Sequence, residues 1–148
     1  MSADGPLAVG LGELKSFAAN QRRREQLAMR YLANLASAEE LVSVPRLQIG
    51  FHHAWHLFIV RLNPNRLKIT RDEVINKMAS AGIGCSVHYR PIHTLSFADG
   101  LIKSAKRLPN AEQAGRSVIS LPLYPLLRPV DVDYVCDRLI SVLRRHSR

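Results

Sequence analysis

The N-terminal quarter of the chain has the apolar spacing of an α-helix. Apolar residues recur every three or four positions, and three consecutive arginines, Arg22–Arg24, interrupt the series. The pattern predicts one long helix over residues 7–36, with Pro6 suited to its first turn. The series comprises Leu7, Leu11, Leu14, Ala18, Ala28, Tyr31, Leu32 and Leu35.

Two strands and one helix are predicted in the middle of the chain. Residues 54–62 contain four successive apolar residues, Leu57–Val60, which are typical of a strand that is buried on both faces. Thr70 and Glu73 have the spacing of a helix-capping box, and Gly82 suits the end of the short helix that follows. Residues 83–89 then alternate between apolar and polar side chains, which indicates a half-buried strand.

The C-terminal third predicts a helix over 109–117, a short strand over 118–121 and a final helix. The final helix has acidic residues in its first turn and basic residues in its last turn, which suits the helix dipole. Few short strands among several helices indicate an α+β fold, in which helices cover one face of a small sheet. We expect residues 1–148 to form a single domain, with the leading helix at 7–36 and a small α/β body at 45–148.

Composition places the chain among globular proteins, because 47% of its 148 residues are hydrophobic and 22% are charged. Neither a membrane span nor a signal peptide is evident, so we expect a cytoplasmic protein with no membrane partner. The 21 Lys and Arg residues exceed the 12 Asp and Glu residues, and the net charge of +9 suits an anionic ligand or nucleic acid. Cys85 and Cys136 form no C-x-x-C pair, and we expect both to be buried, reduced thiols.

Two stretches carry side chains that could take part in chemistry. His52, His53 and His56 resemble a metal cluster, but no carboxylate or cysteine nearby completes a ligand set, so we expect no metal site. Residues 88–93 place two imidazoles, a phenol and a guanidinium at the end of a predicted strand, where such groups could bind a polar or phosphorylated ligand. The sequence contains no glycine-rich phosphate loop and no nucleophile elbow, so the residues alone predict no self-contained active site.

Several stretches, in this order, resemble the motifs of one enzyme family, the pyridoxal-phosphate (PLP)-dependent DegT/DnrJ/EryC1/StrS sugar aminotransferases. They are WHLFIVRL at 55–62, GIGCSVHYRPIH at 82–93, LPNAE at 108–112 and ISLPLYP at 119–125. The chain resembles only the C-terminal small domain of this family, together with the helix that leads into it. The resemblance implies a small, mostly antiparallel sheet covered by helices, as in the small domain of fold-type-I aminotransferases. Residues 94–100 depart from the family pattern.

The resemblance also implies site residues. His88, Tyr89 and His93 would face the active-site cleft and bind substrate, and Arg90 is a weaker candidate for contact with a phosphate oxygen. In the family, the large domain carries the lysine that forms a Schiff base with PLP and the groups that hold the cofactor. None of the five lysines here has a matching context. We therefore expect no catalytic and no cofactor-binding residue in this chain alone, although full-length relatives use PLP.

Three functions stay open at this point. The chain could be an isolated or truncated C-terminal domain that is not catalytic alone and binds a partner or a nucleotide sugar. It could instead be half of a split aminotransferase that a separate large-domain chain completes, with the same exposed surface also able to form a homodimer. In a different class, Arg22–Arg24 and the C-terminal arginines could bind nucleic acid, although aromatic residues do not alternate with them.

Overall fold

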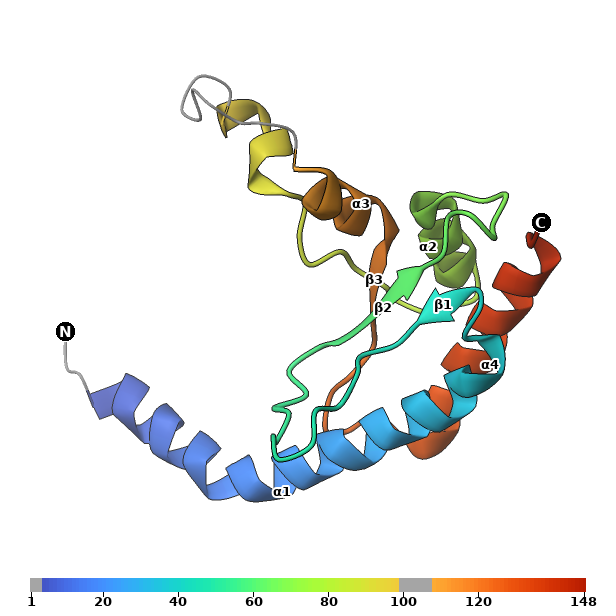
Figure 1. Ribbon diagram of the computed structural model, residues 1–148. Helices are drawn as coiled ribbons and strands as arrows, with labels where there is room; N and C mark the ends of the chain where they lie inside the picture. The colour runs from blue at the N-terminus through green and yellow to red at the C-terminus, as the bar shows by residue number, and fades with distance from the viewer. Residues whose placement is uncertain (1–3, 99–107) are drawn as a thin grey trace.

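The computed structural model describes residues 4–98 and 108–148, which form four α-helices, three strands and three short 3-10 turns (Figure 1). This architecture confirms the predicted α+β class. In the described part of the chain, no helix has both the length and the apolar character that a membrane span requires. The elements are α1 (Asp4–Leu35), η1 (Ala36–Ala38), β1 (Val42–Ser43), β2 (Phe58–Leu62), α2 (Arg71–Ser80), η2 (Ile92–Thr94), η3 (Ser96–Ala98), α3 (Pro109–Ser117), β3 (Val118–Leu121) and α4 (Pro129–Arg145).

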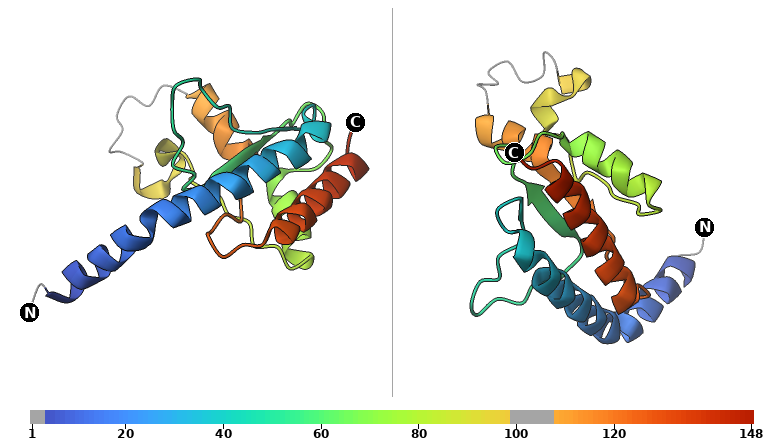
Figure 2. Two further views of the ribbon diagram at one scale, coloured as in Figure 1. Left: turned by 90° about the horizontal axis from the view of Figure 1, so that it is seen from below. Right: turned by 90° about the vertical axis from the view of Figure 1, so that its right-hand side faces the viewer.

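The long helix predicted over 7–36 is present as α1, and its two halves have different surroundings. The C-terminal half packs against α4 and buries Leu27, Ala28, Tyr31 and Leu35. The N-terminal half extends beyond the rest of the chain (Figures 1 and 2). Its apolar residues are 60–70% exposed, so they do not contribute to the core. We call them the α1 stripe: Val9, Leu11, Leu14 and Phe17.

The three strands form one antiparallel sheet in the order β1-β2-β3. Phe58 pairs with Leu121 and Val60 pairs with Ile119, and these four side chains are buried in the core. Ile59, on the other face of β2, is only half-buried, so the prediction of a strand buried on both faces is wrong for this residue. A sheet that buries one face shows alternating exposure along each strand, as β2 does.

The predicted strand over 54–62 begins only at Phe58, because the preceding residues adopt a different backbone. Trp55 has φ = 46°, in the left-handed region that an extended strand does not use. Its ring is buried, and its centroid lies 5.9 Å from that of Phe58, which in turn lies 4.6 Å from that of Tyr31. This aromatic stack joins the loop before β2 to α1.

The capping box predicted for the second helix is confirmed. The Glu73 amide donates to Thr70 Oγ1 at 3.3 Å, and the Thr70 amide donates to Glu73 Oε2 at 2.8 Å. Gly82 follows the helix with φ = 76°, a conformation that glycine adopts without steric cost. The final helix, α4, packs Val132, Val135, Cys136, Leu139 and Leu143 into the core.

The strand predicted over 83–89 is wrong, because this segment pairs with the sheet at a single bridge between Ser86 and Ser120. On the Gly84 side of the bridge, the next hydrogen-bonded position would require a backbone amide from Pro122, which has none. On the His88 side, it would require the Val118 amide, which already donates to the Ala114 carbonyl at the end of α3. The alternation of side chains also ends early, because Tyr89 is exposed rather than packed beside Ile83. The segment is therefore an irregular strap along the edge of β3.

Candidate functional site

The 83–94 segment is held against β3 by backbone hydrogen bonds at one residue. The Ser86 amide donates to the Ser120 carbonyl at 3.2 Å, and the Ser120 amide donates to the Ser86 carbonyl at 2.8 Å. Ser120 is buried, so this contact is shielded from water. It fixes where the following residues, 88–94, leave the sheet.

His88 and Tyr89 lie together just beyond this bridge. The distance between His88 Nδ1 and Ser120 Oγ is 2.7 Å, and Ser86 Oγ lies 3.4 Å from the same nitrogen. The Tyr89 ring meets the His88 ring edge-on, with centroids 4.8 Å apart, and Tyr89 is 78% exposed. Because Nδ1 is engaged by serine hydroxyls, Nε2 is the ring nitrogen that this arrangement leaves for a further partner.

Arg90 is exposed, and one of its guanidinium nitrogens, Nη2, donates to the Thr94 carbonyl at 3.3 Å. A guanidinium has five N–H donors, so this single bond leaves capacity for a carboxylate or phosphate group. The structure thus places Arg90 on the surface next to Tyr89. Its contact with a phosphate oxygen stays a prediction.

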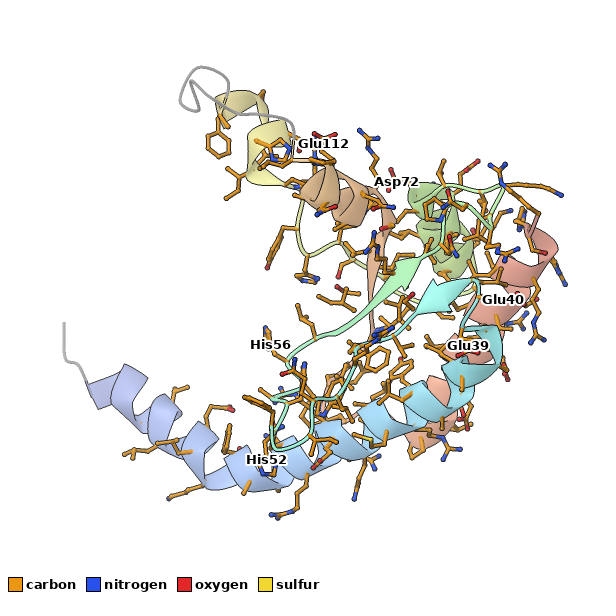
Figure 3. The ribbon with its side chains drawn as sticks, in the orientation of Figure 1. Glu39, Glu40, His52, His56, Asp72 and Glu112 are labelled. Atoms are coloured by element: carbon orange, nitrogen blue, oxygen red, sulfur yellow. The ribbon has the colours of Figure 1, made fainter. Side chains whose placement is uncertain are left out.

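His93 has different surroundings from His88. Its side chain is 12% exposed, and Nε2 lies 3.7 Å from Glu112 Oε1 with no hydrogen-bond partner in the described part of the chain. The other carboxylate oxygen of Glu112 lies 3.5 Å from Nη2 of Arg116 (Figure 3 labels Glu112 on α3). The structure therefore brings His88 and Tyr89 together but turns His93 toward α3, and a substrate contact by His93 stays a prediction.

A close contact with α3 also positions the loop. The ring of Pro91 lies against Gly115, where a Cβ atom would come within 2.5 Å of Pro91 Cδ. Only a glycine leaves this space, so the α3 surface determines how closely the 88–94 loop approaches. Neither Gly115 nor the buried Ser120 was identified from the sequence as part of the site. A serine among the apolar residues of 118–121 is the signal that could have indicated Ser120.

The histidines at 52, 53 and 56 and the two cysteines are the other residues that the sequence offered as candidates for chemistry. Figure 3 shows His52 and His56 on the loop beside α1, and among the described residues no group of three or more His, Cys, Asp or Glu could hold a metal ion. Burial raises the pKa of Cys85 to about 11 and that of Cys136 to about 12. Both thiols are free, and Cys136 is buried as expected, whereas Cys85 is only partly buried.

The three consecutive arginines are not one continuous basic surface. Arg23 donates to the carbonyl oxygens of Pro125 and Leu127 at 3.4 and 3.1 Å. Arg24 is half-buried, and its Nε is shielded from solvent, whereas Arg22 is exposed. Arg23 therefore helps to hold the loop before α4 against α1.

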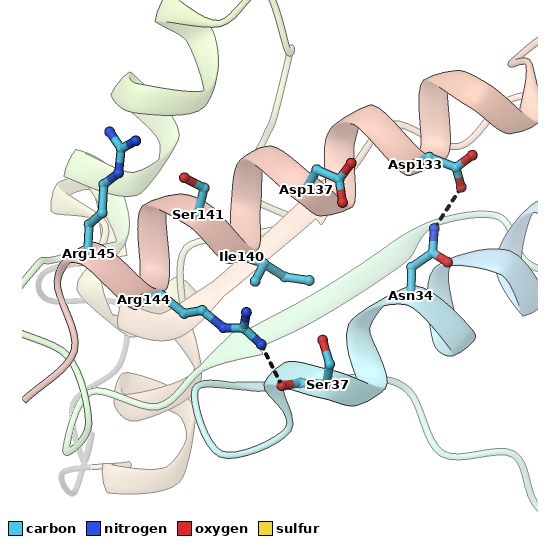
Figure 4. Close-up of a pocket in the computed structure, with 8 residues that line it drawn as sticks. All are labelled: Asn34, Ser37, Asp133, Asp137, Ile140, Ser141, Arg144 and Arg145. Atoms are coloured by element: carbon cyan, nitrogen blue, oxygen red, sulfur yellow. Dashed lines mark hydrogen bonds between the residues drawn. The ribbon is translucent and has the colours of Figure 1, made fainter.

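A hollow of about 650 Å³ lies between α1 and α4 (Figure 4). Two hydrogen bonds join residues that line it. Asn34 Nδ2 donates to Asp133 Oδ1 at 2.8 Å, and Arg144 Nη2 donates to the Ser37 carbonyl at 3.2 Å. Hydrogen bonds from Arg30, and then from Asn34, lower the pKa of Asp133. These contacts join α4 to α1 and to the turn that follows it.

The fold places the chain among aminotransferases. It is 31% identical to Streptomyces venezuelae DesV, solved in complex with a ketimine intermediate, with a TM-score of 0.77 over 94% of this chain and 35% of that one. It is 26% identical, with a TM-score of 0.82, to a Streptococcus pneumoniae protein assigned as a sugar aminotransferase and solved in a PLP form, over 92% and 34% of the two chains.

The chain belongs to the DegT/DnrJ/EryC1/StrS aminotransferase family, whose sequence model matches residues 5–140. The spore coat polysaccharide biosynthesis protein SpsC of Bacillus subtilis is 32% identical over 140 residues, which are 93% of this chain and 36% of that protein. An uncharacterized protein of Methanocaldococcus jannaschii is 35% identical over 92% of this chain and 35% of its own length. The chain thus spans about a third of the relatives that it matches.

The described residues do not fit a covalent PLP site. A lysine that forms an imine with a cofactor is commonly activated by desolvation in a buried pocket. Lys15, Lys68 and Lys77 are exposed, whereas Lys103 and Lys106 lie outside the described residues. We therefore assign no cofactor contact to this part of the chain.

Proposed function

We propose that this chain acts as the C-terminal small domain of a nucleotide-sugar aminotransferase and is not catalytic without a PLP-binding large domain. The observation that carries the proposal is the family match over residues 5–140, which corresponds to about a third of each relative. The large domain would be supplied by another part of the same protein or by a separate chain. When bound there, PLP would supply the electron sink for amino-group transfer.

In this proposal His88 and Tyr89 contribute the small-domain side of the substrate site. The imidazole is oriented by Ser120, and the adjacent exposed phenol offers a second hydrogen-bonding group. Arg90, on the surface beside them, is suited to a phosphate oxygen of a nucleotide sugar. These residues would bind and orient the ligand, whereas His93 would support the loop through Glu112.

The α1 stripe is the proposed contact with the large domain. Four apolar side chains project from a helical half that extends beyond the body of the chain. Leu11, Leu14 and Phe17 follow one another at spacings of three residues and so occupy neighbouring positions on the helix surface. Exposed apolar surface of this kind marks interaction sites in soluble proteins. A second copy of this chain is the alternative occupant, which would give a homodimer through the same stripe.

Co-purification tests the proposal directly. The chain would be produced with a large domain from the same source and captured through a tag on one partner. We expect the wild-type pair to co-purify, and the double variant L14K/F17K to lose its partner because two charges would enter an apolar interface. The matched control Q26K adds a charge to an exposed α1 position outside the α1 stripe and should co-purify normally. Imine absorbance and transaminase activity from the chain alone would overturn the proposal.

Ligand binding is tested separately with the chain alone and with the reconstituted pair. A nucleotide sugar at 100 times its Kd raises the free energy of unfolding by about 2.7 kcal/mol, which a thermal shift detects. We expect H88A and Y89F to weaken this shift, while a control variant such as N76A leaves it unchanged. Strong, salt-sensitive binding to nucleic acid without any nucleotide-sugar shift would favour the basic-module alternative.

A further inference from the structure

A second hollow, of about 440 Å³, lies at the end of the sheet where β2 ends and β3 begins. Its volume is within the range of small-molecule sites. Leu62, Leu67 and Ile69 are buried and supply apolar surface. Four basic side chains line the same hollow, whereas Asp72 is the one acidic side chain among its lining residues. The basic residues are Lys68, Arg71, Arg116 and Arg148.

Two of these guanidinium groups are fixed by the backbone around them. Arg71 has a side chain that is 12% exposed, and its Nη1 donates to the Val118 carbonyl at 3.3 Å while its Nε contacts Asp72. Arg148 Nε donates to the Leu67 carbonyl at 3.0 Å. Both groups therefore keep further N–H donors in a preorganised position, which reduces the entropy lost when an anion binds.

The other two cations are weakly paired or free of carboxylates in the described part of the chain. No carboxylate oxygen there lies within 4.0 Å of Lys68, and Arg116 is 80% exposed at 3.5 Å from Glu112. Asp72 beside Arg71 and Glu112 beside Arg116 offset two of the four positive charges, which leaves Lys68 and Arg148 without a carboxylate partner among the described residues. The hollow therefore has an excess of positive charge over an apolar floor.

We infer that this hollow binds a phosphate-type dianion, either inorganic phosphate or the phosphoryl group of a small phosphomonoester. Charge-assisted hydrogen bonds from arginine and lysine match phosphate oxygens, and the apolar floor would contact an organic body. The first turn of α2 contributes little, because Asp72 and Glu73 already occupy it. The site is built from residues other than His88, Tyr89 and Arg90, so the inference does not depend on the proposed aminotransferase function.

Two titrations test the inference, one with inorganic phosphate and one with phenyl phosphate. Both are carried out at constant ionic strength, and NMR chemical shifts report binding. We expect saturable shifts at Thr70 and Ser117, which line the hollow. The variant K68Q/R116Q should weaken binding at least about tenfold, the change that 1.4 kcal/mol produces. The control K15Q/R22Q removes the same charge from exposed α1 positions and should change the Kd by less than about twofold. Circular dichroism checks that both variants fold.

The two probes distinguish the sources of the anion. Tighter binding of inorganic phosphate would identify the free ion as the ligand, and tighter binding of phenyl phosphate would identify a phosphomonoester that uses the apolar floor. Three results would overturn the inference. The first is a set of shifts that does not saturate, and the second is equal weakening of phosphate binding in K68Q/R116Q and in the control K15Q/R22Q. The third is binding to a nucleic-acid duplex with no response to either small phosphate. Equal weakening would mean that the overall charge, rather than this hollow, attracts the anion.

Discussion

Replacing Gly115 by alanine tests whether α3 positions the candidate site. Two effects of this substitution oppose each other, since one would raise the free energy of unfolding and the other would lower it. In an open helix position the change stabilises by about 0.8–1.0 kcal/mol, since alanine has the higher helix propensity. Here the new Cβ atom would lie 2.5 Å from Pro91 Cδ and 2.7 Å from Pro91 Cγ. Ordinary van der Waals contact between carbons needs about 3.5 Å, so Pro91 must move by about 1 Å.

A proline ring cannot relieve this clash by changing rotamer, because the ring fixes φ. The 88–94 loop must therefore move, and overpacking of this kind costs about 1–3 kcal/mol. After the propensity gain is subtracted, we expect G115A to lose up to about 2 kcal/mol. A loss of 1 kcal/mol lowers the Tm of a chain of this size by about 2–4 °C.

Urea unfolding with G12A as the matched control gives the measurement. Gly12 also lies within a helix, but no atom lies within 4 Å of the point that its new methyl group would occupy, so G12A should not destabilise the chain and should raise its helical signal. In G115A, NMR shifts should change at His88 and Tyr89 as the loop moves. A G115A chain that is more stable than wild type, with unchanged loop shifts, would refute the reasoning.

Three further predictions concern other elements. T70A should cost about 0.5–2 kcal/mol in urea unfolding because it removes the α2 cap, whereas N76A on an exposed turn of α2 should change stability by less than about 0.5 kcal/mol. Because Arg30 lowers the pKa of Asp133, this pair stabilises the fold above the unfolded pKa of about 3.9 and loses its effect as pH falls through the lower folded value. The unfolding midpoint of D133N should therefore fall less than that of wild type in acid. Because burial raises the pKa of Cys85 to about 11, its thiol should be alkylated slowly at pH 8 and faster as the pH rises toward 11. The alkylation rate is measured as a function of pH, with glutathione as the reference thiol.

Local signals made most helices predictable from the sequence. The α2 cap depends on two residues three positions apart, and the acidic and basic ends of α4 lie within its own turns. Strands depended on partners that the sequence does not reveal. β1 is only two residues long, Val42–Ser43, and becomes visible only through its pairing with Leu62 and Arg61. The segment 83–89 has the alternation of a strand, but the ladder cannot continue, because Pro122 has no amide on one side of the bridge and the Val118 amide already bonds to α3 on the other.

The candidate site likewise combines features that the local sequence indicates with features that depend on long-range contacts. Residues 88–93 were identified as one cluster because they are adjacent in the sequence, yet the structure separates them by what lies opposite. Ser120 lies 32 positions after His88 and engages its Nδ1, whereas Glu112 lies beside His93. Long-range contacts of this kind depend on the sheet register and on the placement of α3. Adjacency therefore indicated the chemistry of the loop but not which of its side chains remain open to a ligand.

The surfaces to which we assign binding differ in what they require of the rest of the protein. The α1 stripe lies on a helical half whose large apolar side chains are exposed, and in our proposal the large domain covers them. The basic hollow lies among core residues toward the other end of the molecule and is complete within the described chain. Phosphate binding should therefore persist when the large domain is absent, whereas substrate binding at His88 and Tyr89 should strengthen when it is present. A chain that showed the reverse pattern would contradict both assignments.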